Sequence, residues 1–451
     1  MSERYDQIPK IVAPPPGPRS RELLERQEKL LYPGLVHDFG PFVICRKDGY
    51  AIEDVDGNVY LDMISAMASV PFGSAHAGVT EVAVEALRRY GNEDTHFYSH
   101  EFVLPLAEQL LAAAPRNLSR LDIALNGTEA VETAIRFMRR ATGRPIVIGF
   151  MGAYHGEAGT AGAVGAERAE ISRGYRALMP GFVHVPYPNP YRTPFEPRPG
   201  GSGDGTVDFI RDHLVFHAID PGEVAGVVIE PVLGSGGCVA PPDAFWIALV
   251  ELCREFDWML CADEVKTGFG RTGYLFAVER WDVEPDLLAL GKSMGGGVMP
   301  IGAVLGTDRS MGFDDLSTGS TWSWLPAACA AALETLRIFR EEPILENVRA
   351  LDATALEGFA PLLERYTCLG DVRVVGCFIG LEFVKDRGTK ERDPDLQERV
   401  AWECLQRGLL ADSSTASLNL QPSLVTPIPV IEQAIAIVDG SIGAALAALG
   451  R

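Results

Sequence analysis

The stretch LLALGKSMGGG (residues 287–297) places one lysine, Lys292, between a short apolar run and three consecutive glycines. Such a lysine is either an exposed residue on a turn or an amine that needs room to react, and the neighbouring sequence decides between these two. The apolar part of this stretch belongs to one of six short runs that alternate with helical segments: 119–125, 144–150, 225–230, 258–263, 285–291 and 301–306. Runs of strand length separated by helices predict an α/β fold with a mostly parallel sheet.

The same pattern divides the chain of 451 residues, which is long enough for two structural lobes. The alternating runs predict a large domain over residues 81–330. Residues 1–80 contain a Pro-rich arm, followed by apolar–polar alternation around turn residues, which predicts strands near 42–63 that contribute to a small domain. Residues 331–451 are predicted to form the remainder of this smaller α+β domain.

The composition restricts the class of partner. The formal net charge is −21, which argues against nucleic acid or an anionic membrane surface as a partner. No uninterrupted apolar stretch reaches membrane-spanning length and no signal pattern stands at the N-terminus, so we expect a cytoplasmic protein. The eight cysteines form no CxxC pair and no short Cys/His spacing, which predicts reduced thiols and no metal site.

Polar residues stand just past several of the apolar runs. Open α/β sheets bind ligands at the carboxyl ends of their strands, so we expect these residues to meet. Gly127 and Thr128 follow the run 119–125 and open a helix, whose free N–H groups and positive dipole end favour a phosphate or carboxylate. Tyr154 follows the run 144–150, where its ring could stack on a planar group. Simple helix capping and a surface aromatic are the alternatives.

Two acidic residues and the lysine complete this set. Glu230 ends the run 225–230, and Asp263 ends the run 258–263. An aspartate at the inner end of a buried strand is costly unless it is paired, and a protonated pyridine nitrogen would be a suitable partner. Together with Lys292, a phosphate cup, a stacking ring and an acid for a ring nitrogen meet the requirements of pyridoxal 5′-phosphate (PLP).

Seven segments, in order along nearly the whole chain, resemble the class III (ω-type) aminotransferases among the fold-type I PLP-dependent enzymes. They are DVDGNVYLDM, NGTEAVETAIR, FMGAYHG, VVIEPVLGSGG, ADEVKTGFGRTG, PDLLALGKSMGGG and GSTWSWLPAACAAALETL. The resemblance implies a fold-type I transferase with a large PLP-binding domain and a smaller α+β domain. It also implies a homodimer with active sites at the subunit interface.

The resemblance assigns roles to individual residues. The catalytic pair would be Lys292, the Schiff-base lysine, and Asp263, the partner of the pyridine nitrogen. The other cofactor-binding residues would be Tyr154 and Val265 on the two ring faces, Gly127 and Thr128 at the phosphate, Thr321 reaching the phosphate of the neighbouring subunit, and Glu230 and Lys266.

Three positions depart from the family pattern. Many members carry a C-terminal arginine that grips the substrate carboxylate, and the matching stretch SLNLQPSLV has Asn419 there. In the branch acting on 4-aminobutyrate or ornithine a glutamate pairs with that arginine, and EPVLGSGG has Ser235 instead. The loss of both the arginine and the glutamate is self-consistent, because either residue alone would leave a charge without its partner. Lys266 stands where most members have a glutamine that contacts the cofactor hydroxyl; it either substitutes in that contact or serves as a second base or as an anchor for a carboxylate or carbonyl.

The sequence therefore predicts an aminotransferase that moves an amino group between an amine or ω-amino acid and an oxo acid or aldehyde. The alternative is a racemase, epimerase or decarboxylase of the same fold, because Lys266 and the missing arginine resemble the amino-lactam racemase branch. The acidic residue of that branch near Ser235 is absent here. A third hypothesis is a cofactor-binding protein without catalysis, against which the intact Lys292 and Asp263 argue.

Overall fold

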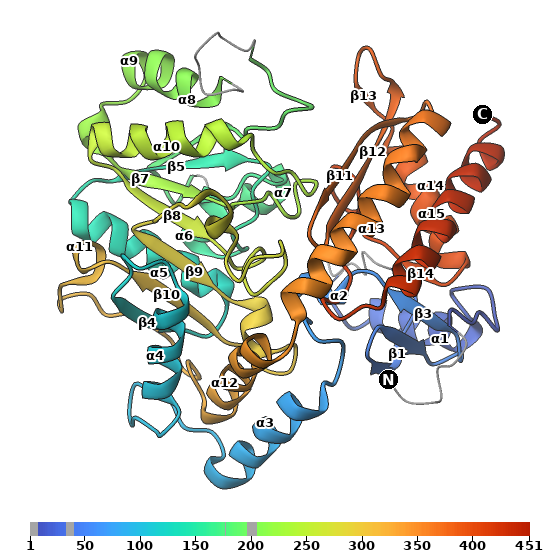
Figure 1. The fold of residues 1–451 in the computed structure, drawn as a ribbon, viewed down its shortest axis with the longest axis horizontal. Helices are drawn as coiled ribbons and strands as arrows, with labels where there is room; N and C mark the ends of the chain where they lie inside the picture. The colour runs from blue at the N-terminus through green and yellow to red at the C-terminus, as the bar shows by residue number, and fades with distance from the viewer. Residues whose placement is uncertain (1–7, 33–39, 176, 196–204) are drawn as a thin grey trace. The chain divides into compact units, whose positions relative to one another are not determined.

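The computed structural model describes residues 8–32, 40–175, 177–195 and 205–451. The chain divides into two compact units (Figure 1). The large unit is Ala77–Glu342, and the small unit joins Met1–His76 to Pro343–Arg451. The boundaries expected after residues 80 and 330 fall within helices α3 (Ala77–Tyr90) and α12 (Pro326–Glu341), and both helices belong whole to the large unit.

A seven-stranded sheet forms the centre of the large unit, in the spatial order β4-β10-β9-β8-β7-β5-β6. β10 runs antiparallel to both of its neighbours, and the other pairs are parallel. All six predicted runs form strands, which confirms the α/β fold; β6 was not predicted. The strands are β4 (Arg120–Ala124), β5 (Ile146–Met151), β6 (Phe182–Pro186), β7 (Val224–Ile229), β8 (Met259–Asp263), β9 (Leu287–Leu290) and β10 (Gly302–Gly306).

Helices cover both faces of this sheet. Leu288 and Leu290 of β9 join the core formed with α4, α10 and α12, whereas Leu287 and Ala289 join the core formed with α5 and α6. Because both faces are buried, the inner strands β7, β9 and β10 are continuously apolar rather than alternating. The further helices are α4 (Val103–Ala113), α5 (Gly127–Thr142), α6 (Gly159–Val164), α7 (Ala169–Ser172), α8 (Thr206–Phe209), α9 (Val215–His217), α10 (Asp243–Phe256) and α11 (Asp308–Met311).

The small unit contains two sheets and five helices among its described residues. One sheet has the order β1-β2-β3-β14, and in the other β12 lies between β11 and β13 and also pairs with β15. The strands are β1 (Ile44–Asp48), β2 (Ala51–Asp54), β3 (Val59–Asp62), β11 (Leu369–Val375), β12 (Phe378–Asp386), β13 (Glu391–Arg392), β14 (Leu409–Leu410) and β15 (Leu418–Leu420). The helices are α1 (Pro18–Glu28), α2 (Ser65–Ala68), α13 (Ile344–Arg365), α14 (Pro394–Gln406) and α15 (Ile428–Ala448).

Helix α15 has the length and apolar composition of a membrane span, with 21 residues. Its buried residues Ile431, Ala434, Val438 and Ile442 recur at helical spacing, and the helix packs against α13 and α14. One buried face and one exposed face are typical of a helix at the surface of a globular unit. We therefore assign α15 to the surface of the small unit, with its apolar face packed on α13 and α14.

The segment Ser65–Ala68 is a left-handed turn of four non-glycine residues, with φ of 50°, 48°, 57° and 63°. A left-handed conformation costs about 1–2 kcal/mol per residue for L-amino acids. Asp62 stabilises the entry to the turn, since its Oδ1 accepts the N–H groups of Ile64 at 3.0 Å and of Ser65 at 2.8 Å. Lys47 Nζ lies 3.2 Å from the other oxygen of Asp62. The turn is thus strained and clamped by its surroundings.

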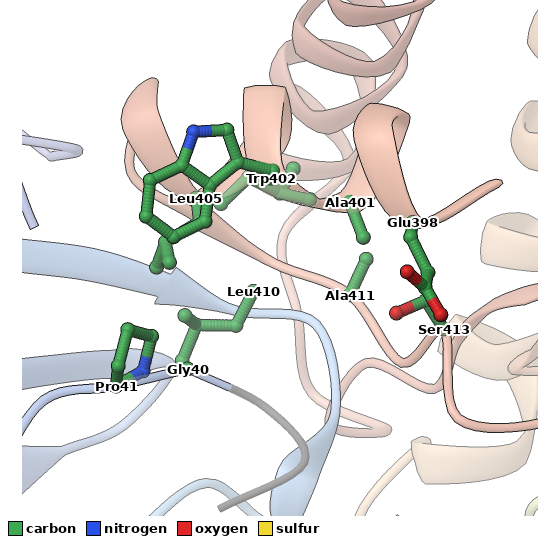
Figure 2. Close-up of a pocket in the computed structure, with 10 residues that line it drawn as sticks. Gly40, Pro41, Glu398, Ala401, Trp402, Leu405, Leu410, Ala411 and Ser413 are labelled. Atoms are coloured by element: carbon green, nitrogen blue, oxygen red, sulfur yellow. The ribbon is translucent and has the colours of Figure 1, made fainter. Parts of the chain in front are cut away.

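A surface pocket of about 160 Å³ lies wholly within the small unit (Figure 2). Trp402 and Leu405 lie at one end of it and Glu398 and Ser413 at the other. None of the residues that the sequence predicts for the cofactor site lines this pocket.

Candidate active site

The predicted site residues other than Thr321 meet at one edge of the seven-stranded sheet. Strands β4, β5, β7, β8 and β9 point in the same direction, because β4 and β9 are both antiparallel to β10 and the rest are parallel. Their carboxyl ends therefore share an edge, as expected for a ligand site. The residues at this edge are Gly127 and Thr128 after β4, Tyr154 after β5, Glu230 after β7, Asp263, Val265 and Lys266 at and after β8, and Lys292 after β9.

Lys292 begins a short 3-10 turn directly after β9, and its own φ is 42°. Its Nζ lies 5.9 Å from the centroid of the Tyr154 ring. Burial lowers the pKa of Lys292 to about 8, helped by the positive charge of Lys266 and opposed by Asp263 and Glu230. At neutral pH a useful fraction of this amine is therefore unprotonated and nucleophilic.

The glycines that follow Lys292 have a structural reason of their own. Gly296 and Gly297 adopt φ of +64° and +77° and end the turn. A Cβ added at Gly296 would lie 2.7 Å from Thr335 Oγ1 and 2.8 Å from Val79 Cγ1. The chain after the lysine is thus held tightly against α3 and α12.

Asp263 is held in place by a histidine. It is 3% exposed, and its Oδ2 lies 2.6 Å from Nδ1 of His155, while its Oδ1 accepts the N–H of Val265 at 3.0 Å. Burial disfavours the charged imidazolium, but the hydrogen bond and the negative charge of Asp263 outweigh it and raise the pKa of His155. A carboxylate paired in this way keeps a fixed orientation at the end of β8.

Glu230 is the second buried acid of the site. Burial raises its pKa, with the nearby Asp263 adding to the effect and His155 opposing it. Its two oxygens accept the N–H groups of Tyr154 and Gly234, each at 2.9 Å. Glu230 therefore links the segment after β5 to the segment after β7.

Gly127 and Thr128 occupy the first two positions of α5, where backbone N–H groups have no acceptor within the helix. The cap residue Asn126 accepts the N–H of Glu129 at 3.1 Å, which leaves the two earlier amides for a ligand. A Cβ at Gly127 would lie 2.4 Å from Cγ1 of Val265, so only glycine lets Val265 approach the helix start. The N-terminus of α5, where a helix can accept an anion, and Val265 are thus neighbours.

Lys266 and Ser235 are in direct contact. Lys266 Nζ donates to Ser235 Oγ at 3.2 Å, and both side chains are 4% exposed. Two of the three departures from the family pattern therefore form one feature of the site.

Thr321 lies apart from this group, exposed in the loop before α12. The N–H of the next residue, Trp322, donates to Asp94 Oδ2 at 3.2 Å, and Thr95 Oγ1 donates to the carbonyl of Trp324 at 2.8 Å. Thr321 is thus presented outward from the large unit.

Two further residues were not among the predicted site residues. His155 follows Tyr154 in the sequence, and its position directly after the β5 run could have identified it as a site residue. Glu264 follows Asp263 and is fully buried; its oxygens accept the N–H of Val278 at 2.9 Å and the hydroxyl of Thr267. Burial raises the pKa of Glu264 to about 7. Its contacts thus link the residue that directly precedes Val265 and Lys266 to Thr267 and to Val278.

The arrangement fits PLP. A neutral amine beside an aromatic ring can bind the aldehyde, a buried carboxylate can pair with the ring nitrogen, and a helix N-terminus can take the phosphate. His155 Nε2 is buried and has no hydrogen-bond partner among the described residues, so the polar set at this edge is still incomplete in the protein alone.

Comparison with known proteins agrees with this chemistry. The chain matches the class-III aminotransferase family over residues 36–440. It is 34% identical over 446 residues to the alanine/serine racemase of Pyrococcus horikoshii, and this alignment covers 97% of this chain and 93% of that protein. It is 32% identical over 412 residues to the 4-aminobutyrate aminotransferase of Escherichia coli, covering 90% and 93%.

Solved structures show the same fold. The chain superposes on an amine transaminase from an uncultivated Pseudomonas species, in its PLP-bound form, with a TM-score of 0.84 and 29% identity over 93% of this chain and 99% of that one. The resemblance predicted from the sequence is thereby confirmed. The chain belongs to the class III aminotransferase family of PLP-dependent enzymes.

Proposed function

We propose that this enzyme binds PLP covalently through Lys292 and transfers amino groups between an amine or amino acid and an oxo compound. The observation that carries the proposal is the meeting of the amine of Lys292 with the buried Asp263–His155 pair at one sheet edge. In this proposal Tyr154 and Val265 enclose the cofactor ring, Gly127 and Thr128 bind its phosphate, and Lys266 contacts its hydroxyl. Glu230 holds the Tyr154 segment in position.

The protein's own groups account for the proton transfers. Asp263, oriented by His155, would hold a proton on the ring nitrogen. When bound, PLP supplies a ring that accepts the electrons left on the substrate carbon after proton loss. Lys292 would take the proton from the substrate carbon and return it at a second carbon, for which a pKa near neutrality is suitable. Water would supply the oxygen with which the donor leaves as an oxo compound, the amino group would stay with the cofactor, and the reverse sequence would aminate the acceptor.

The covalent link is directly testable. Purified protein incubated with PLP and borohydride should gain the mass of reduced PLP on the peptide that contains Lys292, and Lys292→Ala should gain none. A panel of amine donors and oxo acceptors should then show cofactor conversion that an oxo acid reverses. Label on another lysine, or no label at all, would refute the assignment.

Racemisation or epimerisation is the second candidate, and the similarity to an alanine/serine racemase favours it. A racemase returns the proton to the opposite face of the same carbon, so it needs no oxo acid and no switch for a second carboxylate. Asn419 is consistent with this, since its side chain is engaged by Ser417 Oγ at 2.6 Å and Thr415 Oγ1 at 2.8 Å. Deuterium exchange at the substrate carbon without conversion of the cofactor would favour racemisation over transamination.

We also propose a homodimer located in the cytoplasm. Phe97, Tyr98 and Leu104 are 74%, 70% and 65% exposed in the single chain, and Trp322 belongs to a loop bonded to the neighbouring segment. An apolar group of this kind next to the exposed Thr321 suits a subunit interface that shares the phosphate site.

All eight cysteines are free thiols, which fits the reducing compartment of the proposed cytoplasmic location.

A further inference from the structure

The loop of the large unit that carries Thr321 departs from ordinary backbone geometry. Trp322 and Trp324 have φ of 78° and 53°, in the left-handed region that bulky L-residues rarely adopt. Residues in this region persist only where their surroundings hold them, and they gather at functional sites. Contacts from other segments must therefore hold this loop in its conformation.

The inner end of the loop is anchored within the large unit. Trp324 is 1% exposed, and its Nε1 donates to the carbonyl of Gly302 at 2.8 Å. Its own carbonyl accepts the hydroxyl of Thr95 at 2.8 Å and lies 2.9 Å from Nε2 of His100. These contacts fix Trp324, whereas Trp322 lies further out and is 46% exposed.

The carboxylate of Asp94 contacts the outer end of the loop. Its Oδ2 accepts the N–H of Trp322 at 3.2 Å, across 228 residues of sequence. Its Oδ1 accepts the N–H of His96 at 3.0 Å and lies 2.9 Å from Nδ1 of the same residue. Burial acts to raise the pKa of Asp94, but the hydrogen bonds from His96 and Trp322 outweigh it and lower this pKa. Asp94 is therefore charged at neutral pH and joins the two segments.

A local turn explains only part of these contacts. The bond from Oδ1 to an N–H two residues later is the usual Asx turn, but Oδ2 reaches a strained residue far along the chain. His96, which Oδ1 holds, packs against the start of the loop, since a Cβ at Gly319 would lie 2.1 Å from its Nε2. Both oxygens of Asp94 therefore act on the loop that presents Thr321, one directly and the other through His96.

We propose that Asp94 is a positioning residue for Thr321. By accepting the N–H of Trp322 it fixes the peptide group that joins residues 321 and 322, and with it the direction of the Thr321 hydroxyl. The inference rests on the proposed function, in which this hydroxyl reaches the cofactor phosphate of the neighbouring subunit. Because hydrogen bonds weaken steeply when the donor is misaligned, the loss of Asp94 should weaken the phosphate contact specifically.

PLP and pyridoxal, which lacks the phosphate, isolate this contact. Titrating each into cofactor-free protein and following the absorbance gives two Kd values, and the ratio of the pyridoxal Kd to the PLP Kd measures what the phosphate adds. We expect Thr321→Ala to lower this ratio about 10- to 100-fold and Asp94→Ala to lower it about 10-fold, with the Kd of pyridoxal nearly unchanged. The double variant should lose no more than Thr321→Ala, because a positioning residue acts only through that hydroxyl.

Control variants separate geometry from charge. Removing a negative charge should by itself favour a phosphate, so a lower ratio in Asp94→Ala runs against the charge effect. Asp315→Ala removes the same charge from an exposed residue paired with Arg140 and should keep the wild-type ratio. Asp94→Asn retains one acceptor oxygen and should lose less than Asp94→Ala.

Sedimentation equilibrium on the same samples should show dimers throughout. A wild type without a preference for PLP, or a Thr321→Ala enzyme with the wild-type ratio, would refute the shared phosphate site of the proposed function and this inference with it. Three results would overturn only the role of Asp94: an unchanged ratio in Asp94→Ala where Thr321→Ala lowers it, additive losses in the double variant, or an Asp94→Ala enzyme that has dissociated into monomers.

Discussion

Replacing Lys266 by glutamine tests the electrostatic coupling between the two lysines of the site. The pKa of Lys292 is lowered from 10.5 to about 8, first by burial and second by Lys266. With a pKa of about 8, roughly a tenth of the amine is neutral at pH 7, against about 0.03% for an ordinary lysine, a ratio of about 300. Lys266→Gln removes only the second cause, so the pKa should rise above 8 and stay below 10.5.

The rate of imine formation between PLP and the cofactor-free protein reports this pKa, because only the neutral amine attacks. Stopped-flow absorbance from pH 6 to pH 11 should give a midpoint near 8 for the wild type and a higher one for Lys266→Gln. The two rates should differ most near neutral pH and converge in strong alkali. Lys385→Gln serves as the control, because it removes the same positive charge from an exposed lysine of the small unit that pairs with Glu391. An unchanged or lower midpoint in Lys266→Gln would show that the charge at 266 does not act on Lys292.

Three further predictions concern stability and assembly. Ala66 is exposed in the left-handed turn, and Ala66→Gly should raise the free energy of unfolding by about 1 kcal/mol. Ala353→Gly on the exposed face of α13 should lower it by a similar amount. If both variants shifted the denaturation midpoint equally and in the same direction, the strain assigned to the turn would be contradicted. The pKa of Glu264 is raised from 4.5 to about 7, so the wild type loses up to about 3 kcal/mol of stability as pH rises through this interval, and Glu264→Gln should gain in denaturation midpoint relative to wild type between pH 5 and pH 8. A constant difference would refute the burial of that charge. Trp322→Glu should convert a dimer into monomers in sedimentation equilibrium, and a wild-type monomer would contradict the proposed interface.

The sequence predicts the central sheet well because its inner strands are buried on both faces. Continuous apolar runs such as 285–291 are visible without any tertiary information. β6 was missed because Phe182–Pro186 is short, mostly half-buried at the sheet edge, and carries a histidine at its centre. The topology rule that places ligands at strand ends was enough to group Asp263 with Lys292.

Pairing between distant side chains was not predictable in this way. His155 and Asp263 are 108 residues apart, and no local pattern states that one holds the other. The contact between Lys266 and Ser235 spans 31 residues and depends on the close passage of the lysine stem over Gly234. These contacts follow from the packing of neighbouring strands, which fixes which loop residues meet.

The small unit is built from two separate segments of the chain, and the ribosome synthesises these segments at different times. Residues 77–342 are contiguous, so the large unit can fold as soon as it has left the ribosome. Strand β3, in contrast, pairs with β14 through Leu61 and Leu409, and that partner is translated about 350 residues later. The N-terminal segment must therefore wait with an open strand edge, and a circular permutant that begins at residue 77 would make both units contiguous and remove this delay.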